Sequence, residues 1–370
     1  MRIDIIGAGP AGSYAAYNLA KLGHKVKVYE RDSDIGKPVQ CTGILSDYFE
    51  SLMKPDPSFV LNTVDKTRIY APNGRFVEAK IKKNFVICRK KFDNYVANLA
   101  KKEGVEYTLN ASYKNHSLEA KGVASRINLA GKEIISKADA LVGADGPNSE
   151  VARSAGILSD RKFIIGTQVE AKLKNDNVVE FYPYIGVYAW IVPVTSTSAR
   201  IGVAAYKRSS ELFKEFTLKR AGKLIPIENQ SGVIPIFNPR QKAQKGRVYL
   251  IGDAATFNKA TSGGGINQAL KAAKILAECI DRGEDYDKAW RKEMFLNLYA
   301  HYIMHRMMLR FSEKDWNRLV EIFSQEKMKK LLFSESRDRV VSMGLRAIFT
   351  EPRLFAYARR FPFEDLRYLI

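Results

Sequence analysis

The feature that most constrains this chain is a glycine-rich turn near its start, set between an apolar run and a helical segment. The run Arg2–Ile6 predicts a β-strand, the turn Gly7–Gly12 reads G-A-G-P-A-G, and Ser13–Leu22 predicts a helix with small and apolar residues on one face. A second alternating run, Lys25–Glu30, predicts the next strand. A strand, a glycine turn, a helix and a strand within about thirty residues form the parallel βαβ unit that binds dinucleotides.

Each glycine of the turn has its own task in such a unit. Gly7 permits the tight turn, Gly9 lets the backbone approach a pyrophosphate, and Gly12 lets the helix pack against the strand. The helix N-terminus offers free N–H groups and a positive dipole to the phosphates. Glu30, at the end of the second strand, can accept hydrogen bonds from both ribose hydroxyls. The alternative is a structural glycine turn without a ligand.

Length and charge set wider limits. The chain has 370 residues, enough for two or three domains, and a formal net charge of +20. This charge serves solubility or attracts an anionic surface, either nucleic acid or lipid. We find no signal peptide and no run of eighteen apolar residues. We therefore expect an intracellular, cytoplasmic protein, either soluble or attached to a membrane surface.

The cysteine and histidine pattern argues against a metal site. Cys41, Cys88 and Cys279 are far apart, and the chain has no Cys-x-x-Cys motif. His301 and His305 are one helical turn apart, but no other candidate ligand is near them in the sequence. We therefore predict neither a structural metal nor a disulfide framework.

The pattern of elements changes in the middle of the chain. Between Phe163 and Ala205, four short runs separated by turn residues predict antiparallel strands, and Arg247–Ile251 then returns to the parallel type. This order predicts an α/β fold (α+β overall). It has a Rossmann-like nucleotide-binding domain, an inserted antiparallel-sheet substrate domain and a C-terminal helical region. The predicted boundaries are 1–60, 84–160 and 241–285 for the first, 61–83 and 161–240 for the second, and 286–370 for the third.

Three later segments indicate which dinucleotide is bound. Arg89 stands just before a predicted helix, Ala144-Asp145-Gly146 follows a strand, and Gly252-Asp253-Ala254-Ala255 ends another strand. This ordered set resembles the flavoproteins related to para-hydroxybenzoate hydroxylase, over about residues 1–285. The resemblance implies FAD as the cofactor, with Asp253 bonding a ribityl hydroxyl.

Further segments resemble one branch of that superfamily, the geranylgeranyl reductases, including the archaeal digeranylgeranylglycerophospholipid reductases. They are the cysteine loop Gly36–Ile44, the glycine loop Lys259–Ile266 and the aromatic segment Tyr188–Pro193. The chain departs from the family pattern at Val192, where a Phe is usual, and at Val194, where a Lys is common. Thr42-Gly43 also replaces a pair of glycines.

The resemblance implies reduction of isoprenoid C=C bonds in geranylgeranyl-type membrane lipids. It also implies a cofactor site formed by Gly7, Gly9, Ala11, Gly12, Glu30, Arg31, Cys41, Thr42, Ile44, Arg89, Ala111, Asp253, Gly264, Gly265 and Ile266. Its candidate catalytic residues are Cys41, Tyr188 and Trp190. Cys41 is either a proton donor, a positioning group or a packed thiol. Tyr188 and Trp190 alternate along a strand, so they share one face and either line a substrate pocket or fill the core.

Two other functions remain open. Tyr188–Pro193 also resembles a halogenase motif, so a flavin monooxygenase or halogenase is the first alternative. The second is an RNA-associated flavoprotein, which the charge permits although no nucleic-acid module is recognisable. We expect no nucleic-acid partner. No second G-x-G-x-x-G is present, so the electron donor is open between ferredoxin, a deazaflavin and NAD(P)H.

The C-terminal region combines aromatic with basic residues. Lysines and arginines from Arg291 to Arg360, Arg337 among them, are interleaved with aromatic side chains. Such a surface suits the headgroup region of an anionic bilayer, and a prenyl-lipid substrate favours peripheral attachment at the inner face of the cell membrane. The alternative is a helical domain that packs its aromatics inward. These aromatic residues include Trp290, Tyr299, Tyr302, Phe311, Trp316, Phe323, Phe333, Phe349, Phe355, Tyr357, Phe361, Phe363 and Tyr368.

Overall fold

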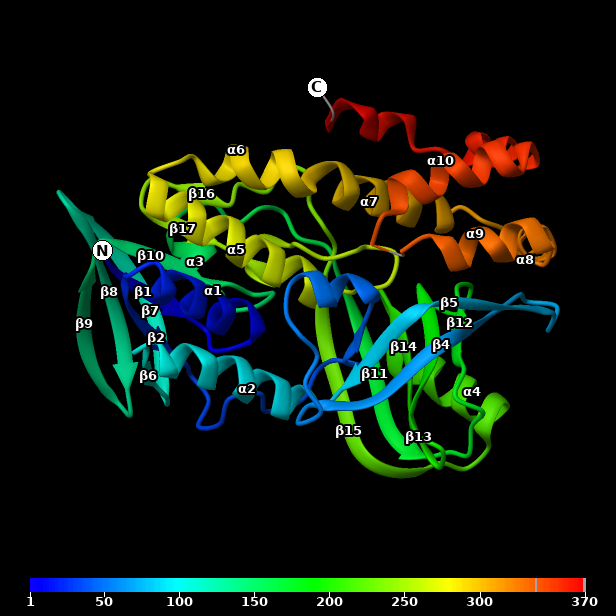
Figure 1. Cartoon of the computed structure of the whole chain (residues 1–370), viewed down its shortest axis with the longest axis horizontal. Coiled ribbons are helices and arrows are strands. Elements are labelled where there is room, and N and C mark those ends of the chain that lie inside the picture. The colour runs from blue at the N-terminus through cyan, green and yellow to red at the C-terminus, as the bar shows by residue number, and fades with distance from the viewer. Residues whose placement is uncertain (337, 369–370) are drawn as a thin grey trace.

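The glycine turn follows the end of a central strand of a largely parallel sheet, as its sequence predicts. A computed structural model of the chain describes residues 1–336 and 338–368, so Arg337 lies outside the described residues. Figure 1 shows this sheet toward one end of the long axis and a larger sheet toward the other, with helices running along both. The predicted α/β fold with a Rossmann-like unit is confirmed.

The six-stranded sheet has the order β16-β17-β10-β1-β2-β6, and four of its five pairings are parallel, whereas β16 pairs antiparallel with β17. The strands are short and apolar, and Ile3, Ile5 and Val28 are buried because helices cover the sheet. Helix α1 packs between α2 and α5. The bounds are β1 Arg2–Ile6, β2 Lys25–Tyr29, β6 Glu106–Thr108, β10 Ala140–Gly143, β16 Gln244–Lys245, β17 Val248–Leu250, α1 Pro10–Lys21, α2 Arg89–Lys102, α3 Glu150–Ser154, α5 Ile266–Arg282, η1 Asp47–Ser51 and η2 Gly252–Ala255.

The eight-stranded sheet has the order β15-β11-β14-β13-β12-β4-β5-β3 and is antiparallel except between β12 and β4. One face packs around Tyr188 and Trp190, and the other packs against helix α4. The bounds are β3 Ile44–Leu45, β4 Val60–Tyr70, β5 Phe76–Ile87, β11 Phe163–Lys172, β12 Val179–Tyr182, β13 Tyr188–Thr195, β14 Ser198–Ala205, β15 Ile225–Pro235 and α4 Ser209–Ala221.

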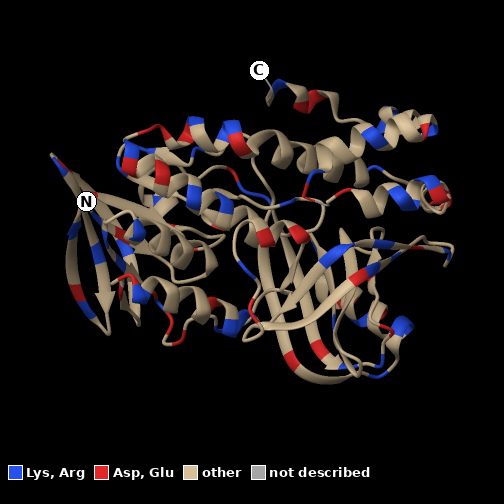
Figure 2. Cartoon of the chain, in the orientation of Figure 1, with Lys and Arg blue, Asp and Glu red and all other residues tan. Residues whose placement is uncertain are grey.

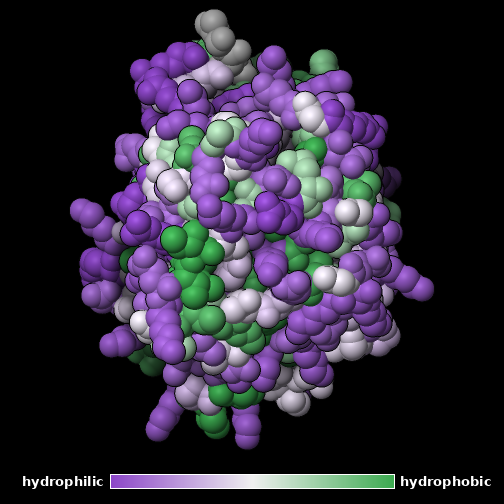
Figure 3. Space-filling model, turned by 90° about the vertical axis from the view of Figure 1, so that its left-hand side faces the viewer, coloured by the Kyte–Doolittle hydropathy of each residue, from purple (hydrophilic) through white to green (hydrophobic). Residues whose placement is uncertain are grey.

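A third sheet of three strands was not predicted from the sequence. It comprises β7 Ala111–Glu119, β8 Gly122–Leu129 and β9 Lys132–Ala138. Its outer strands carry few buried residues, and even Leu118 and Ile135 are exposed. Strands with so little to bury show only a weak alternation of apolar and polar residues in the sequence. Figure 3 shows that this end of the molecule is mostly hydrophilic, with apolar side chains interrupted by polar ones.

The C-terminal region is helical, as expected, and its aromatic residues divide into two groups. Trp290, Tyr299, Trp316 and Tyr357 are buried, whereas Phe333, Phe349, Phe355 and Phe363 are exposed. Figure 2 shows basic residues interspersed with acidic ones along these helices. The bounds are α6 Tyr286–Trp290, η3 Arg291–Phe295, α7 Leu296–Met308, α8 Glu313–Phe323, α9 Glu326–Ser334, α10 Val340–Thr350, η4 Pro352–Arg360 and η5 Phe363–Tyr368.

Candidate active site

The glycine turn is packed so tightly that side chains cannot replace two of its glycines. Gly7 has φ +102°, and a Cβ atom there would lie 2.4 Å from the carbonyl oxygen of Ala144. A Cβ atom on Gly12 would lie 1.9 Å from the carbonyl oxygen of Gly7. Helix α1 begins at Pro10, within the glycine turn itself and three residues before the predicted start.

The same turn leaves room on its outer side. A Cβ atom on Gly9 would meet no atom within 4 Å, and no side chain caps the N-terminus of α1. The free N–H groups of the first turn are therefore available to an anion. Next to them, the Glu30 carboxylate accepts hydrogen bonds from the amides of Ala8 (2.7 Å) and Asp32 (3.0 Å). A carboxylate has about four acceptor positions, so Glu30 keeps capacity for a ligand hydroxyl.

Three other predicted cofactor residues lie around this end. Ala11, in the first turn of α1, approaches Gly252, whose added Cβ would lie 3.0 Å from its methyl group. The Ala111 amide bonds the carbonyl of Glu30 at 2.8 Å, so β7 begins beside that residue. The Arg31 side chain is mostly exposed, and its Nε atom lies 3.7 Å from Oδ1 of Asp32. Arg31 therefore lies on the surface beside the site and does not line its interior.

A half-buried arginine, paired with a buried carboxylate, links the two ends of the site. Arg89 forms a two-pronged ion pair with Asp93, at 3.0 and 2.9 Å, and also interacts with Cys41. Asp253 lies near both Arg89 and Arg161. Burial raises the pKa of Asp253 to about 6, although both cations and Asn258 act to lower it. An acidic acceptor is thus held at a partly exposed position, where a ligand hydroxyl could bond it.

The predicted glycine loop lies against Asp253. A Cβ atom on Gly265 would lie 3.2 Å from Oδ1 of Asp253, and one on Gly264 would lie 2.9 Å from Cε of Lys259. Helix α5 starts at Ile266 with Gly265 as its N-cap and no side-chain cap, so its first N–H groups can stabilise negative charge. The sequence spacing therefore brings the Asp253 turn and the glycine loop together.

The candidate catalytic residues meet at this loop. The hydroxyl oxygen of Tyr188 lies 2.5 Å from where a Cβ atom on Gly263 would stand. This hydroxyl is buried and has no hydrogen-bond partner among the described residues. Burial, with Cys41 and Tyr206 nearby, raises the pKa of Tyr188, so it stays protonated. Trp190 lies on the same face of the sheet, with its ring centroid 5.6 Å from that of Tyr188.

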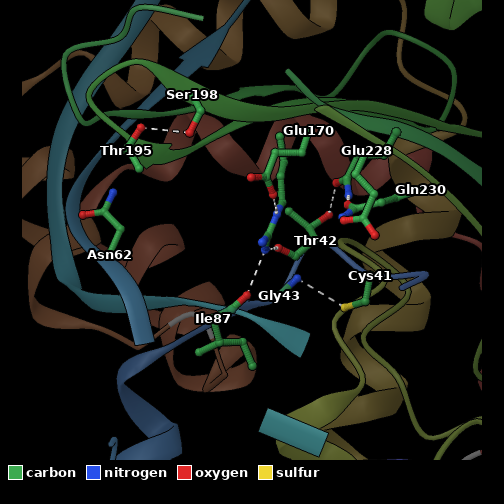
Figure 4. A network of polar contacts seen from close by, with 12 residues as sticks. Cys41, Thr42, Gly43, Asn62, Ile87, Glu170, Thr195, Ser198, Glu228 and Gln230 are labelled. Carbon is green, nitrogen blue, oxygen red and sulfur yellow. Dashed lines mark hydrogen bonds and ion pairs between the residues drawn. The ribbon is translucent and has the colours of Figure 1, made fainter. Parts of the chain in front are cut away.

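The cysteine loop lies between the two sheets. The Sγ atom of Cys41 accepts a hydrogen bond from the amide of Gly43 at 3.3 Å, and the thiol is half-buried (Figure 4). The Thr42 hydroxyl donates to the eight-stranded sheet, and Ile44 begins β3 by pairing with Val86. The loop therefore reaches Arg89 on one side and the substrate-type sheet on the other.

Sequence reasoning missed two residues of this site. Arg161 donates to the carbonyls of Pro147 and Ala254, each at 2.6 Å, and burial lowers its pKa to about 10. Gln168 accepts hydrogen bonds from Thr42 and Trp190. Both stand alone in the sequence, outside any motif, so no local signal could have identified them.

The histidine pair is bound to hydroxyl groups. His301 interacts with the Thr261 hydroxyl, and His305 with that of Tyr206, each at 2.7 Å. Burial, followed by Arg306, lowers the pKa of His305 to about 4. Within residues 1–336 and 338–368, no group of three or more His, Cys, Asp or Glu side chains is arranged to hold a metal ion.

Comparison with known proteins decides the family. The chain is 30% identical over 369 residues to the digeranylgeranylglycerophospholipid reductase of Methanothrix thermoacetophila, covering 90% of this chain and 94% of that protein. The chain belongs to the digeranylgeranylglycerophospholipid reductase family. The protein of the same name from Methanocaldococcus jannaschii is 27% identical, over 87% of this chain and 90% of its own length. Residues 5–41 also match the NAD(P)-binding Rossmann-like domain.

Solved structures with the same fold include a reductase-like protein and a halogenase. A geranylgeranyl bacteriochlorophyll reductase-like protein from Thermoplasma acidophilum superposes with a TM-score of 0.86 at 24% identity, over 100% of this chain and 99% of that one. The flavin-dependent halogenase CmlS gives 0.69 at 17% identity, over 90% of this chain and 72% of its own. The named relatives make the chain an oxidoreductase, and the solved structures show that it has the fold of flavin-dependent enzymes. In its described part, every helix is too short or too polar to cross a bilayer.

Proposed function

We propose that this chain binds one FAD without a covalent bond and reduces isoprenoid C=C bonds of geranylgeranyl-type membrane lipids. The observation that carries the proposal is the meeting of Cys41, Tyr188 and the glycine loop beside Asp253, where the two large sheets join. The family's named activity supports the substrate class.

The described residues fit FAD along the whole site. Gly9 and the uncapped start of α1 suit the pyrophosphate, and Glu30 suits a ribose. Asp253 suits a ribityl hydroxyl, and the start of α5 suits the flavin ring. When bound, FAD supplies the hydride for reduction of a double bond. Acid precipitation is expected to release all the flavin into the supernatant, and flavin that stays with the chain would contradict the non-covalent claim.

The side chains near the glycine loop supply the rest of the chemistry. Tyr188 and Trp190 form an apolar wall that orients a prenyl chain and excludes water. Cys41, whose Sγ lies beside Arg89 and near Tyr188, either donates the one proton that the other carbon of the double bond takes or positions the substrate. The electron donor is a ferredoxin, a deazaflavin or NAD(P)H.

We further propose that the C-terminal helices attach the protein to an anionic membrane, from which a prenyl lipid must be drawn. A hollow of about 450 Å³ between α9 and α10 is lined by Lys327, Lys330 and Arg346 together with Phe349, which is 84% exposed. Cations beside an exposed aromatic ring suit lipid headgroups at the edge of the acyl region. Lys327 pairs with Glu351 and Arg346 pairs with Glu335, so a carboxylate already offsets the charge of each. Of the three cations, Lys330 is therefore the one we expect to interact most strongly with a lipid phosphate.

Anaerobic stopped-flow measurements test the reaction. Dithionite-reduced protein mixed with digeranylgeranyl lipid is expected to reoxidise its flavin, and the product should gain two mass units per reduced bond. No reoxidation by lipid would contradict the proposal. Reoxidation that requires oxygen, with consumption of O₂ in the presence of an aromatic substrate, would instead favour a monooxygenase or halogenase.

A further inference from the structure

A row of cross-strand neighbours in the eight-stranded sheet joins the cysteine loop to the aromatic wall. Gln230 on β15 is paired with Gln168 on β11, Gln168 with Gly202 on β14, and Gly202 with Trp190 on β13. Residues paired in this way project to the same face of a sheet. Gln168 is only 5% exposed, so each of its polar atoms needs a partner.

Gly202 allows the row to close. Trp190 and Gln168 stand two strands apart, and the strand between them would normally place a side chain in the gap. A Cβ atom on Gly202 would lie 2.3 Å from Cζ2 of Trp190, so the indole ring lies directly over the bare glycine backbone. The ring thereby reaches Gln168, and Nε1 of Trp190 donates to Oε1 of Gln168 at 2.8 Å.

The same Gln168 oxygen also accepts a hydrogen bond from the cysteine loop. The Thr42 hydroxyl, next to Cys41, donates to Oε1 of Gln168 at 2.6 Å. On its other side, Nε2 of Gln168 donates to Oε1 of Gln230, whose own Nε2 donates to Glu228 at 2.7 Å (Figure 4). An indole N–H can only donate and a carboxylate can only accept. These two ends therefore fix the orientation of both amides between them.

A second contact holds the loop backbone to the same sheet. Arg200 on β14 pairs with Glu170 at 2.9 Å and donates to the carbonyls of Thr42 (2.6 Å) and Ile87 (2.9 Å), as Figure 4 shows for Thr42, Ile87 and Glu170. Arg200 is 3% exposed, so these are interior bonds. Arg200 fixes where the loop backbone lies, whereas Gln168 connects the loop to the tryptophan.

We propose that Gln168 is a positioning residue, which holds Cys41 in a fixed place relative to the Trp190 wall by accepting hydrogen bonds from both sides through one oxygen. The catalytic part of this inference rests on the proposed function, because it requires that the loop and the wall act on one substrate. A displaced loop would move the thiol away from the reacting carbon, and a misplacement of about 1 Å costs roughly a hundredfold in rate.

The test uses full-length holoprotein in which Cys88 and Cys279 are replaced by alanine, so that Cys41 is the remaining thiol. Gln168→Met keeps the side-chain volume but removes the amide, and with it the hydrogen bonds to Thr42, Trp190 and Gln230, whereas Thr42→Val removes only the loop bond. Thr217→Val is the matched control, because Thr217 is a buried threonine in α4, on the opposite side of the sheet. The readouts are the rate of Cys41 alkylation by a maleimide, the retained FAD, and kcat and KM on digeranylgeranyl lipid.

Gln168→Met and Thr42→Val are each expected to change the alkylation rate of Cys41 by about threefold or more. Thr42→Val, which loses one buried hydrogen bond, should lower kcat about tenfold with FAD occupancy unchanged. Gln168→Met, which loses three, should lower kcat at least as much, also with FAD retained. The double variant should behave like Gln168→Met alone, because Gln168→Met already breaks the bond that Thr42→Val removes. The control should leave the alkylation rate and kcat as they are.

Unchanged alkylation and kcat in folded Gln168→Met would overturn the proposal, and so would equal effects in Thr217→Val. If Gln168→Met does not fold, Thr42→Val decides the matter in the same assays. The alkylation rate needs no substrate. A protein that fails to reduce prenyl lipid would therefore contradict the proposed function, while the alkylation series would still decide whether Gln168 holds the loop.

Discussion

The two large sheets hold their parts of the site in different ways. Beside the six-stranded sheet, the groups of the candidate site are mainly backbone, and glycines such as Gly7 and Gly12 stand where a side chain would clash with that backbone. In the eight-stranded sheet, side chains from different strands hold one another, as Gln168 holds Trp190 and Thr42. The first arrangement depends on residues close in sequence, whereas the second depends on residues that only the sheet pairing brings together.

The largest effect is expected at the backbone-built site. Gly12→Val would place side-chain atoms where a Cβ alone already lies 1.9 Å from the Gly7 carbonyl, so the turn cannot form. We expect loss of FAD binding and little folded protein, measured by flavin absorbance and yield. Gly344→Ala is the matched control, because a Cβ there meets nothing within 4 Å and α10 should be stabilised by roughly 0.5–1 kcal/mol. Normal flavin content in Gly12→Val would show that the turn does not touch the cofactor.

The next effect concerns the acidic residue between the two arrangements. Asp253→Ala removes a charge-assisted acceptor worth roughly 1.5–3 kcal/mol, so FAD affinity should fall by about one to two decades. Titration of the apoprotein with FAD, followed by fluorescence quenching, measures this change. An unaltered dissociation constant would place Asp253 away from the cofactor.

Sequence patterns located the backbone-built part well, for a physical reason. A turn such as Gly7–Gly12 needs certain residue types at fixed spacing, and that need is visible in one short segment. The glycine loop and Asp253 were located in the same way. Gln168, Gly202 and Arg161 could not be, because their roles come from partners in distant segments. The three-stranded sheet was missed because its exposed strands carry little apolar alternation.

The C-terminal region shows the same limit. From the sequence, the aromatic residues of this region could face either inward or outward, because the rotational phase of each predicted helix was unknown. In the structure Trp290 packs 4.6 Å from Phe257 within the main core, whereas Phe349 is exposed. Which aromatic residues face inward depends on how each helix is rotated against the core of the six-stranded sheet, and the sequence alone does not give that rotation.

A smaller effect is expected for the thiol that connects the two sheets. Cys41→Ser should keep FAD, because the loop bonds of Thr42 and the backbone remain, but should slow the oxidation of reduced flavin by lipid by about tenfold. Stopped-flow absorbance under anaerobic conditions measures the rate. Cys88→Ser is the control, since Cys88 lies at the start of α2. Equal rates in wild type and Cys41→Ser would leave Cys41 as a packed thiol only.

A pH-dependent effect on stability tests the burial of Asp253. Its folded pKa of about 6 lies above the ordinary value of 3.8, so the native apoprotein binds an extra proton between these values and loses stability as pH rises through them. Asp253→Asn removes this loss. The variant should therefore melt above the wild-type apoprotein at pH 7 and close to it at pH 4. A Tm difference that is the same at both pH values would contradict a raised pKa.

The smallest effect is expected at the surface, where neither sheet is involved. Deleting residues 286–370 would remove Trp290 and Tyr299 from the main core, so membrane attachment has to be tested with point variants of the exposed set. Lys330→Gln should weaken co-sedimentation with phosphatidylglycerol vesicles about fivefold at low salt, since one basic group near such a surface contributes about 1 kcal/mol. Phe349→Ser should weaken it as well, because it removes an exposed apolar ring from the same hollow. Phe76→Ser is the control, because Phe76 is also exposed but lies on β5, outside the C-terminal helices. Binding should fall with salt and be absent on phosphatidylcholine, because attraction to the headgroups is electrostatic. If the wild-type protein stays in the supernatant with anionic vesicles at low salt, the membrane proposal is wrong, and the enzyme must receive its lipid by another route.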